Sequence, residues 1–125
     1  MAKITLKTDC GNSPKMEFLK DFNVAFANSD VDYLASAVSD TIVWNIIGDK
    51  TIAGKENFKK ELVTMQSIKV AEMELNHLLS DGKEGAASGV MTMENGVAYA
   101  FSDVYEFTGV GGTQLQSITS FVIEI

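Results

Sequence analysis

An acidic side chain lies in the middle of an aromatic stripe near the end of the chain. If residues 97 to 108 form a strand, alternate residues share one face of the sheet. That face carries Asp103 with three aromatic neighbours, Tyr99, Phe101 and Tyr105. A carboxyl group among aromatic rings loses hydration, which raises its pKa and fits it to act as an acid or a base. A bulge or a dimer contact would instead turn Asp103 to water or to a backbone amide. Both interpretations stay open, and Asp103 is the candidate catalytic residue.

The single histidine, His77, is the other side chain with acid–base chemistry near neutral pH. It alternates with Met73, Leu75 and Leu79, which predicts a place on an apolar strand face. A core histidine with one satisfied hydrogen bond is the favoured interpretation, and an acid–base group in a pocket is the alternative. A metal site needs about three or four clustered ligands, and one histidine with one cysteine offers no such cluster. We therefore expect neither a metal nor a cofactor.

Trp44 and Asn45 follow each other in TIVWNIIGDKTIAGKENF, a segment that predicts a strand, a turn and a helix start. The Trp44 ring offers a flat wall for an apolar ligand, and Asn45 offers a polar anchor. Neighbouring side chains of a regular strand point to opposite faces. Both can line one pocket only if the strand is bulged.

Three helices are predicted. Asn12 or Ser13 can cap the first, since Pro14 suits its first position. Its core face includes Phe22 and Phe26, one helical turn apart. Residues 28 to 30 end it and cap a short second helix, and the third spans about 55 to 65.

From Ser67 onward the apolar period is two, and Asp81-Gly82 and Asn95-Gly96 are dipeptides that favour tight hairpins. The predicted strands cover about 67 to 79, 84 to 94, 97 to 108 and 114 to 124. Gly85 and Gly89 allow the second of them to bend sharply. A curved sheet that holds a pocket follows, with Met91 among its inward residues.

The order of elements, ααββαββββ, resembles the nuclear transport factor 2-like superfamily, which includes SnoaL-like and ketosteroid isomerase-like proteins. The resemblance runs from about Ser13 to Ile125. It implies an α+β fold in which a cone-shaped, curved antiparallel (mixed) sheet wraps around three N-terminal helices. We expect a single domain over residues 1–125, with residues 1–12 loosely ordered.

The resemblance also assigns roles to individual residues. The run from Asn45 through Gly48 to Gly54 keeps the spacing around the general base of ketosteroid isomerases, with Asn45 in the position of the base. Asparagine takes no proton at neutral pH. Phe22 stands where the family has a tyrosine donor, and only Asp103, followed by Val104, matches the third catalytic position. Because a positioned base supplies roughly 10² to 10⁴ in rate, steroid isomerisation by the usual mechanism is not expected.

The limonene epoxide hydrolase type is a second relative. It uses an asparagine with a tyrosine two residues before it, and an Asp-Arg-Asp set that activates water. Here Val43 replaces the tyrosine, and the sheet strands contain no arginine. The chain therefore also lacks the residues that the limonene epoxide hydrolase mechanism uses. The resemblance still favours Asn45 over Trp44 as the residue that faces the pocket.

Two functions remain. The first is a small-molecule-binding protein with an apolar pocket for an apolar or weakly polar ligand. The predicted ligand-binding residues are Phe22, Phe26, Trp44, Asn45, His77, Met91, Tyr99, Phe101 and Tyr105. The alternative is a SnoaL-like or ketosteroid isomerase-like enzyme, an isomerase, cyclase or hydrolase, with Asp103 as acid or base.

Composition narrows the partners. A net charge of −7 repels nucleic acid, and no apolar run reaches the roughly 18 to 20 residues that span a bilayer. One cysteine, Cys10, and a start without a signal peptide make the cytoplasm the expected compartment. Relatives commonly pair through the outer sheet face, where Ala98, Ala100 and Ser102 permit close approach, so the resemblance implies a homodimer.

Overall fold

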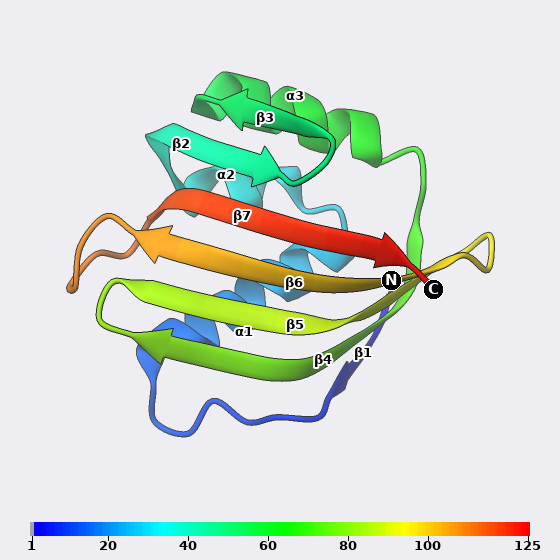
Figure 1. The fold of residues 1–125 in the computed structure, drawn as a ribbon, viewed down its shortest axis with the longest axis horizontal. Helices are drawn as coiled ribbons and strands as arrows, with labels where there is room; N and C mark the ends of the chain where they lie inside the picture. The colour runs from blue at the N-terminus through cyan, green and yellow to red at the C-terminus, as the bar shows by residue number, and fades with distance from the viewer. Residues whose placement is uncertain (1) are drawn as a thin grey trace.

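The computed structural model describes residues 2–125, which form three helices and one seven-stranded sheet (Figure 1). In chain order the elements are β1 (Lys3–Leu6), α1 (Pro14–Ala27), α2 (Val31–Ser36), β2 (Val38–Ile46), β3 (Lys50–Ala53), α3 (Lys55–Met65), β4 (Val70–Asp81), β5 (Glu84–Met93), β6 (Ala98–Phe107) and β7 (Leu115–Glu124). From α1 onward this is the predicted order.

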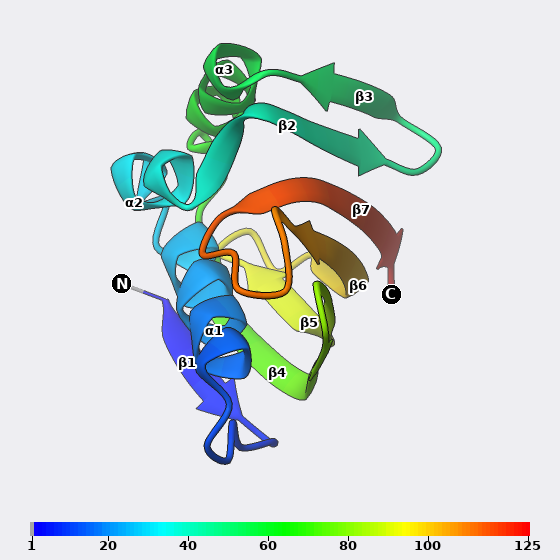
Figure 2. The same cartoon turned by 90° about the vertical axis from the view of Figure 1, so that its left-hand side faces the viewer.

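The sheet is mixed, with the strand order β1-β4-β5-β6-β7-β2-β3. The β1–β4 and β2–β7 pairs are parallel, and the remaining pairs are antiparallel. Figure 2 shows the sheet curling from β4 through β7 around one side of α1, with β2 and β3 beyond. The predicted α+β fold, a cone-shaped sheet wrapped around helices, is confirmed.

The helix starts follow from capping side chains. Ser13, not Asn12, caps α1, and its hydroxyl accepts a hydrogen bond of 3.2 Å from the Met16 amide. Asp30 caps α2 in the same way, accepting from the Tyr33 amide at 3.2 Å. These caps satisfy amides that the first turn of a helix leaves unpaired, so they set where each helix begins.

The N-terminal segment differs from the prediction. Residues 1–12 were expected to be loosely ordered, yet β1 lies within them and pairs in parallel with β4, Ile4 opposite Met73. Residue 1 lies outside the described residues. Four residues cannot hold a strand alone, and β1 exists because the edge of β4 offers unpaired backbone groups.

A bulge in β4 changes which side chains face inward. Leu75 pairs with Gly89 and His77 pairs with Ser88, so Asn76 is an extra residue that shifts the alternation. Leu78 is therefore 2% exposed, whereas Leu79 is 63% exposed. His77 is exposed as well, and its predicted position on the apolar face is wrong.

Gly89 allows this bulge. A Cβ atom at Gly89 would lie 1.9 Å from the carbonyl oxygen of Glu74, well inside contact distance. Only a residue without a side chain lets the two backbones approach so closely. The bulge lies at Gly89, as the prediction of a bend allows, whereas at Gly85 the β4–β5 pair stays in register. β4 and β5 curl around α1 (Figure 2).

None of the helices within residues 2–125 combines the length and the apolar character that a membrane crossing requires.

Replacing Gly89 by alanine is expected to destabilise the protein by about 1–3 kcal/mol, because the new methyl group must push the Glu74 carbonyl away. Urea unfolding measures the change. Gly109→Ala is the matched control, since a Cβ there meets nothing within 4 Å. Equal unfolding midpoints for the two variants would contradict this account of the bend.

Candidate ligand-binding cavity

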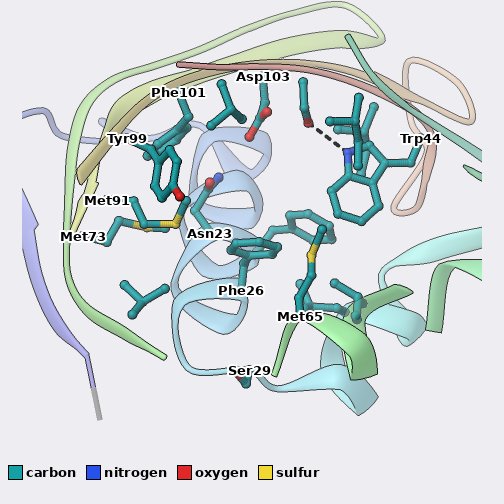
Figure 3. Close-up of a pocket in the computed structure, with 18 of the residues that line it drawn as sticks. Asn23, Phe26, Ser29, Trp44, Met65, Met73, Met91, Tyr99, Phe101 and Asp103 are labelled. Atoms are coloured by element: carbon teal, nitrogen blue, oxygen red, sulfur yellow. Dashed lines mark hydrogen bonds between the residues drawn. The ribbon is translucent and has the colours of Figure 1, made fainter. Parts of the chain in front are cut away.

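A cavity of about 690 Å³ lies between the helices and the concave face of the sheet (Figure 3). Its wall is mostly aromatic, aliphatic and methionine side chains. Those from the sheet include Trp44, Met73, Met91, Tyr99 and Phe101, and those from the helices include Phe22, Phe26, Phe58, Leu62 and Met65. The volume and the apolar wall suit a small organic molecule.

Most residues predicted for the site line this cavity. They are Phe22, Phe26, Trp44, Met91, Tyr99, Phe101, Asp103 and Tyr105. The inward-facing stripe of β6 is therefore arranged as its alternation predicts. His77 and Asn45 do not line the cavity. The bulge in β4 places His77 on the surface, away from the wall.

Asn45 points away from the cavity, contrary to the choice made from spacing. β2 runs regularly through this region, with Trp44 opposite Ile52 and Asn45 opposite Thr51. Trp44 is 7% exposed and lines the cavity, whereas the Asn45 amide oxygen accepts a hydrogen bond of 3.3 Å from the Thr51 hydroxyl. The two-residue period decides the direction of these side chains.

Asp103 is held at the cavity wall by a directed chain of hydrogen bonds. The Tyr105 hydroxyl donates to Asp103 Oδ2 at 3.3 Å. The same hydroxyl accepts from Asn23 Nδ2 at 3.0 Å, and Asn23 Nδ2 also donates to the Leu19 carbonyl at 2.8 Å. α1 thus supports a residue of β6 through one tyrosine.

A second chain reaches Asp103 from the other side. Trp44 Nε1 donates to Ser120 Oγ at 2.9 Å, the bond drawn as a dashed line at Trp44 in Figure 3. Ser120 lies directly opposite Asp103 in the β6–β7 pair, where its hydroxyl group acts to lower the pKa of the carboxyl group. Two hydroxyl groups therefore stabilise the charged form of Asp103.

Burial nevertheless dominates the acidity of Asp103. Removal from bulk water raises the pKa of this carboxyl from 3.8 to about 6, while hydrogen bonds from Ser120 and Tyr105 act in the opposite direction. Asp103 is half-buried, and the exposed part of its side chain faces the cavity (Figure 3). Burial, together with the charge of Asp103, raises the pKa of Tyr105 well above 10. The carboxyl group can therefore gain or lose a proton near neutral pH.

Asn23 and Ser120 are parts of the site that sequence reasoning missed. Both are buried polar residues. Each interrupts an apolar pattern: Asn23 lies one turn after Leu19 on the inward face of α1, and Ser120 alternates with Ile118 and Val122 in β7. A polar residue on an otherwise apolar face is the signal that indicates such a partner.

Within residues 2–125, no group of three or more histidine, cysteine, aspartate or glutamate side chains is close enough to hold a metal ion.

Comparison with known proteins identifies the fold. No protein-family model and no curated protein matches the sequence. Among solved structures, a nuclear transport factor 2-like protein of unknown function from Burkholderia xenovorans superposes with a TM-score of 0.74 at 18% identity, over 87% of this chain and 82% of that one. An epoxide hydrolase of Mycobacterium tuberculosis similar to limonene epoxide hydrolase gives 0.73 at 19%, over 86% and 81%.

A third structure is an epoxide hydrolase/cyclase-like enzyme described in pyran ring formation of the polyether salinomycin. It superposes with a TM-score of 0.74 at 20% identity, over 90% of this chain and 93% of that one. The chain therefore has the nuclear transport factor 2-like fold, as its element order predicts. Sequence identities this low support an assignment of the fold but not of a reaction.

The raised pKa of Asp103 makes a prediction about stability. Because the folded pKa of about 6 exceeds 3.8, the folded state holds the proton more tightly than the unfolded state. The stabilisation is complete below about pH 4 and is lost as the pH rises through about 6. Relative to Asp103→Asn, which cannot titrate, wild type should lose about 2.5 kcal/mol between about pH 4 and pH 7.

Urea unfolding of both proteins across this range gives the measurement, and the titrations that the two proteins share cancel in the difference. A difference in stability that stays constant with pH would show that Asp103 has an ordinary pKa.

Proposed function

We propose that this protein binds an apolar or weakly polar small molecule in the cavity. One observation carries the proposal: an apolar space of about 690 Å³ opens beside the Asp103 carboxyl group, which accepts a hydrogen bond from Tyr105 and has Ser120 opposite it. Burying such a group costs stability, which a purely structural core would avoid. A pocket with an apolar wall and few polar groups is the usual form of a ligand site.

The test is binding of Nile red, a neutral apolar dye that fluoresces in dry surroundings. Wild type should bind it and Met65→Glu should bind it at least about tenfold more weakly, because the carboxylate enters the apolar wall of the cavity. Val63→Glu is the matched control on the same helix, since Val63 is 56% exposed and does not line the cavity. Equal affinities for Met65→Glu and Val63→Glu would refute binding in the cavity.

An enzymatic role is the second candidate, favoured by the acid–base position of Asp103. The reaction would be an isomerisation, cyclisation or hydrolysis, with Asp103 as proton donor or acceptor. The chain has ten lysines and no arginine, so water activation by an Asp-Arg-Asp set does not apply. Asp103 then works with Tyr105 and Ser120 as its hydrogen-bond partners.

On this alternative, Asp103→Asn should abolish turnover while the affinity for a neutral ligand changes by less than about tenfold, or roughly 1.4 kcal/mol. The measurement compares a panel of epoxide, ketone and lactone substrates on both proteins, followed by a binding titration of any compound that reacts. If the variant keeps full activity, the catalytic role of Asp103 is wrong.

The same proposal includes a homodimer formed through the outer face of the sheet. Val43, Val104, Phe121 and Ile123 are exposed by 40% to 66% on that face. The small residues Ala100 and Ser102 lie opposite Ile123 and Phe121, so a second copy can approach closely. An exposed apolar area of this kind is typical of an interface.

Sedimentation at about micromolar concentration should give twice the 13.5 kDa of one chain for wild type, and 13.5 kDa for Phe121→Glu. Val63→Glu on α3 again serves as the control and should stay dimeric. A wild type that sediments only as a 13.5 kDa species would remove the dimer from the proposal.

A further inference from the structure

The polar groups on the Tyr105 side of Asp103 have already given their hydrogens to protein acceptors. Asn23 uses its amide nitrogen for two bonds, to the Leu19 carbonyl and to the Tyr105 hydroxyl. Tyr105 then gives its own hydroxyl hydrogen to Asp103. None of these hydrogens is left for a ligand.

On the Ser120 side, the polar hydrogen of Trp44 is also used within the protein. Trp44 has one polar hydrogen, and Ser120 accepts it. The Ser120 oxygen is thereby an acceptor toward Trp44, and its own hydroxyl hydrogen stays free to turn toward Asp103, which lies directly opposite in the β6–β7 pair. The Tyr105 chain thus ends in a hydrogen bond to the Asp103 carboxylate, and the Trp44 chain ends on the Ser120 hydroxyl group opposite it.

By contrast, hydrogen-bond acceptors that face the cavity are still available to a ligand. Asn23 is 4% exposed, and no donor within residues 2–125 reaches its Oδ1 atom. Within residues 2–125, every polar side-chain atom that is fully shielded from solvent has a hydrogen-bond partner. Because Asn23 Oδ1 has none, this oxygen must be partly accessible, and Asn23 lines the cavity. Figure 3 shows the Asn23 amide and the Asp103 carboxyl group on the same side of the cavity. A carboxylate has about four acceptor positions, so Asp103 also keeps room for another donor.

The charge around Asp103 is unbalanced. No lysine or histidine lines the cavity, and Asp103 takes part in no ion pair within the described residues. Asp49 adds a second acidic side chain to the lining, and the net charge of the chain is −7. A partly buried carboxylate without a counter-ion is unfavourable, and a negative field attracts cations.

We propose that the cavity takes an apolar amine in its protonated form, with the ammonium group against the Asp103 carboxylate and Asn23 Oδ1 and the hydrocarbon body against the methionines and aromatic rings. This rests on the proposed binding of a small molecule in the cavity, and it replaces a weakly polar head group by a cationic one while keeping the apolar body. The ammonium supplies the hydrogens and the positive charge that the site lacks, and charge-assisted hydrogen bonds are the stronger kind.

Other head groups fit less well. A carboxylate ligand would meet Asp103 and an amide oxygen, both repulsive toward an anion. An alcohol can donate one hydrogen but leaves the charge of Asp103 uncompensated. Tyr99 and Ser29, whose hydroxyl groups also line the cavity, can accept as well as donate and so do not oppose an amine.

Affinity for the amine follows the ionisation of Asp103. The other titratable side chains that line the cavity are Tyr99 and Tyr105 on β6 and Asp49 in the β2–β3 turn, while the linings from α1, α3, β4, β5 and β7 carry none. Affinity should therefore rise between about pH 5 and pH 7 as Asp103 loses its proton, and level off above.

The test uses three compounds that share one rigid hydrocarbon body: 1-adamantylamine, 1-adamantanol and 1-adamantanecarboxylate. The affinity of each compound is measured by its displacement of Nile red from wild type at about pH 7.5, where the amine is protonated. The amine should bind at least about tenfold more tightly than the alcohol and about a hundredfold more tightly than the carboxylate. Asp103→Asn should bring amine and alcohol to within about threefold and remove the pH dependence, with Nile red still bound.

Asp81→Asn is the matched control, because it makes the same change at an exposed carboxyl group that does not line the cavity. It should keep the preference for the amine. If wild type binds Nile red and the alcohol as well as the amine, or if Asp103→Asn keeps the preference, the amine proposal fails and binding in the cavity stands. If wild type binds neither Nile red nor any of the three compounds, the proposed function fails and the amine proposal fails with it.

Discussion

The contact between two backbones at Gly89 and Glu74 is the constraint on which the cavity depends. The extra residue Asn76 makes a bulge in β4 opposite Gly89, and the absence of a side chain at Gly89 leaves room for it. A bulge of this kind bends the strand that carries it. The bend carries β4 and β5 around α1, so the inner face of the sheet becomes concave. Side chains from both ends of that concave face then surround a space that they do not fill.

Inside this space the protein tolerates a carboxyl group at some cost in stability. Two hydroxyl groups offset part of the desolvation of Asp103, and each is oriented by a nitrogen donor behind it, Asn23 or Trp44. The donors come from α1 and β2, which lie on different sides of β6. Asp103 is thus fixed by elements far apart in the sequence, and its proton affinity is a property of the whole assembled cone.

Much of the architecture could be predicted because it is encoded locally. The Ser13 cap, the hairpin glycines Gly82 and Gly96 with positive φ, and the alternation around Asp103 each depend on a few neighbouring residues. His77 could not be placed this way, since the apolar period through β4 reads as regular and only the meeting with Gly89 creates the bulge. Asn45 was assigned inward from spacing, although the two-residue period that starts from Trp44 already pointed it outward. The hydrogen-bond partners of Asn23 and Ser120 could not be predicted from the sequence, because these partners lie on other elements.

The position of Trp44 gives the molecule an internal optical reporter. It is the single tryptophan in the chain, its ring packs edge-on against Phe58, and its nitrogen is separated from the Asp103 carboxylate by one hydroxyl group. Indole emission responds to nearby charge and to the strength of its hydrogen bond. Any event that changes the charge of Asp103, or that brings a new molecule against the ring, will therefore be recorded in the emission spectrum of the unmodified protein, with no label attached.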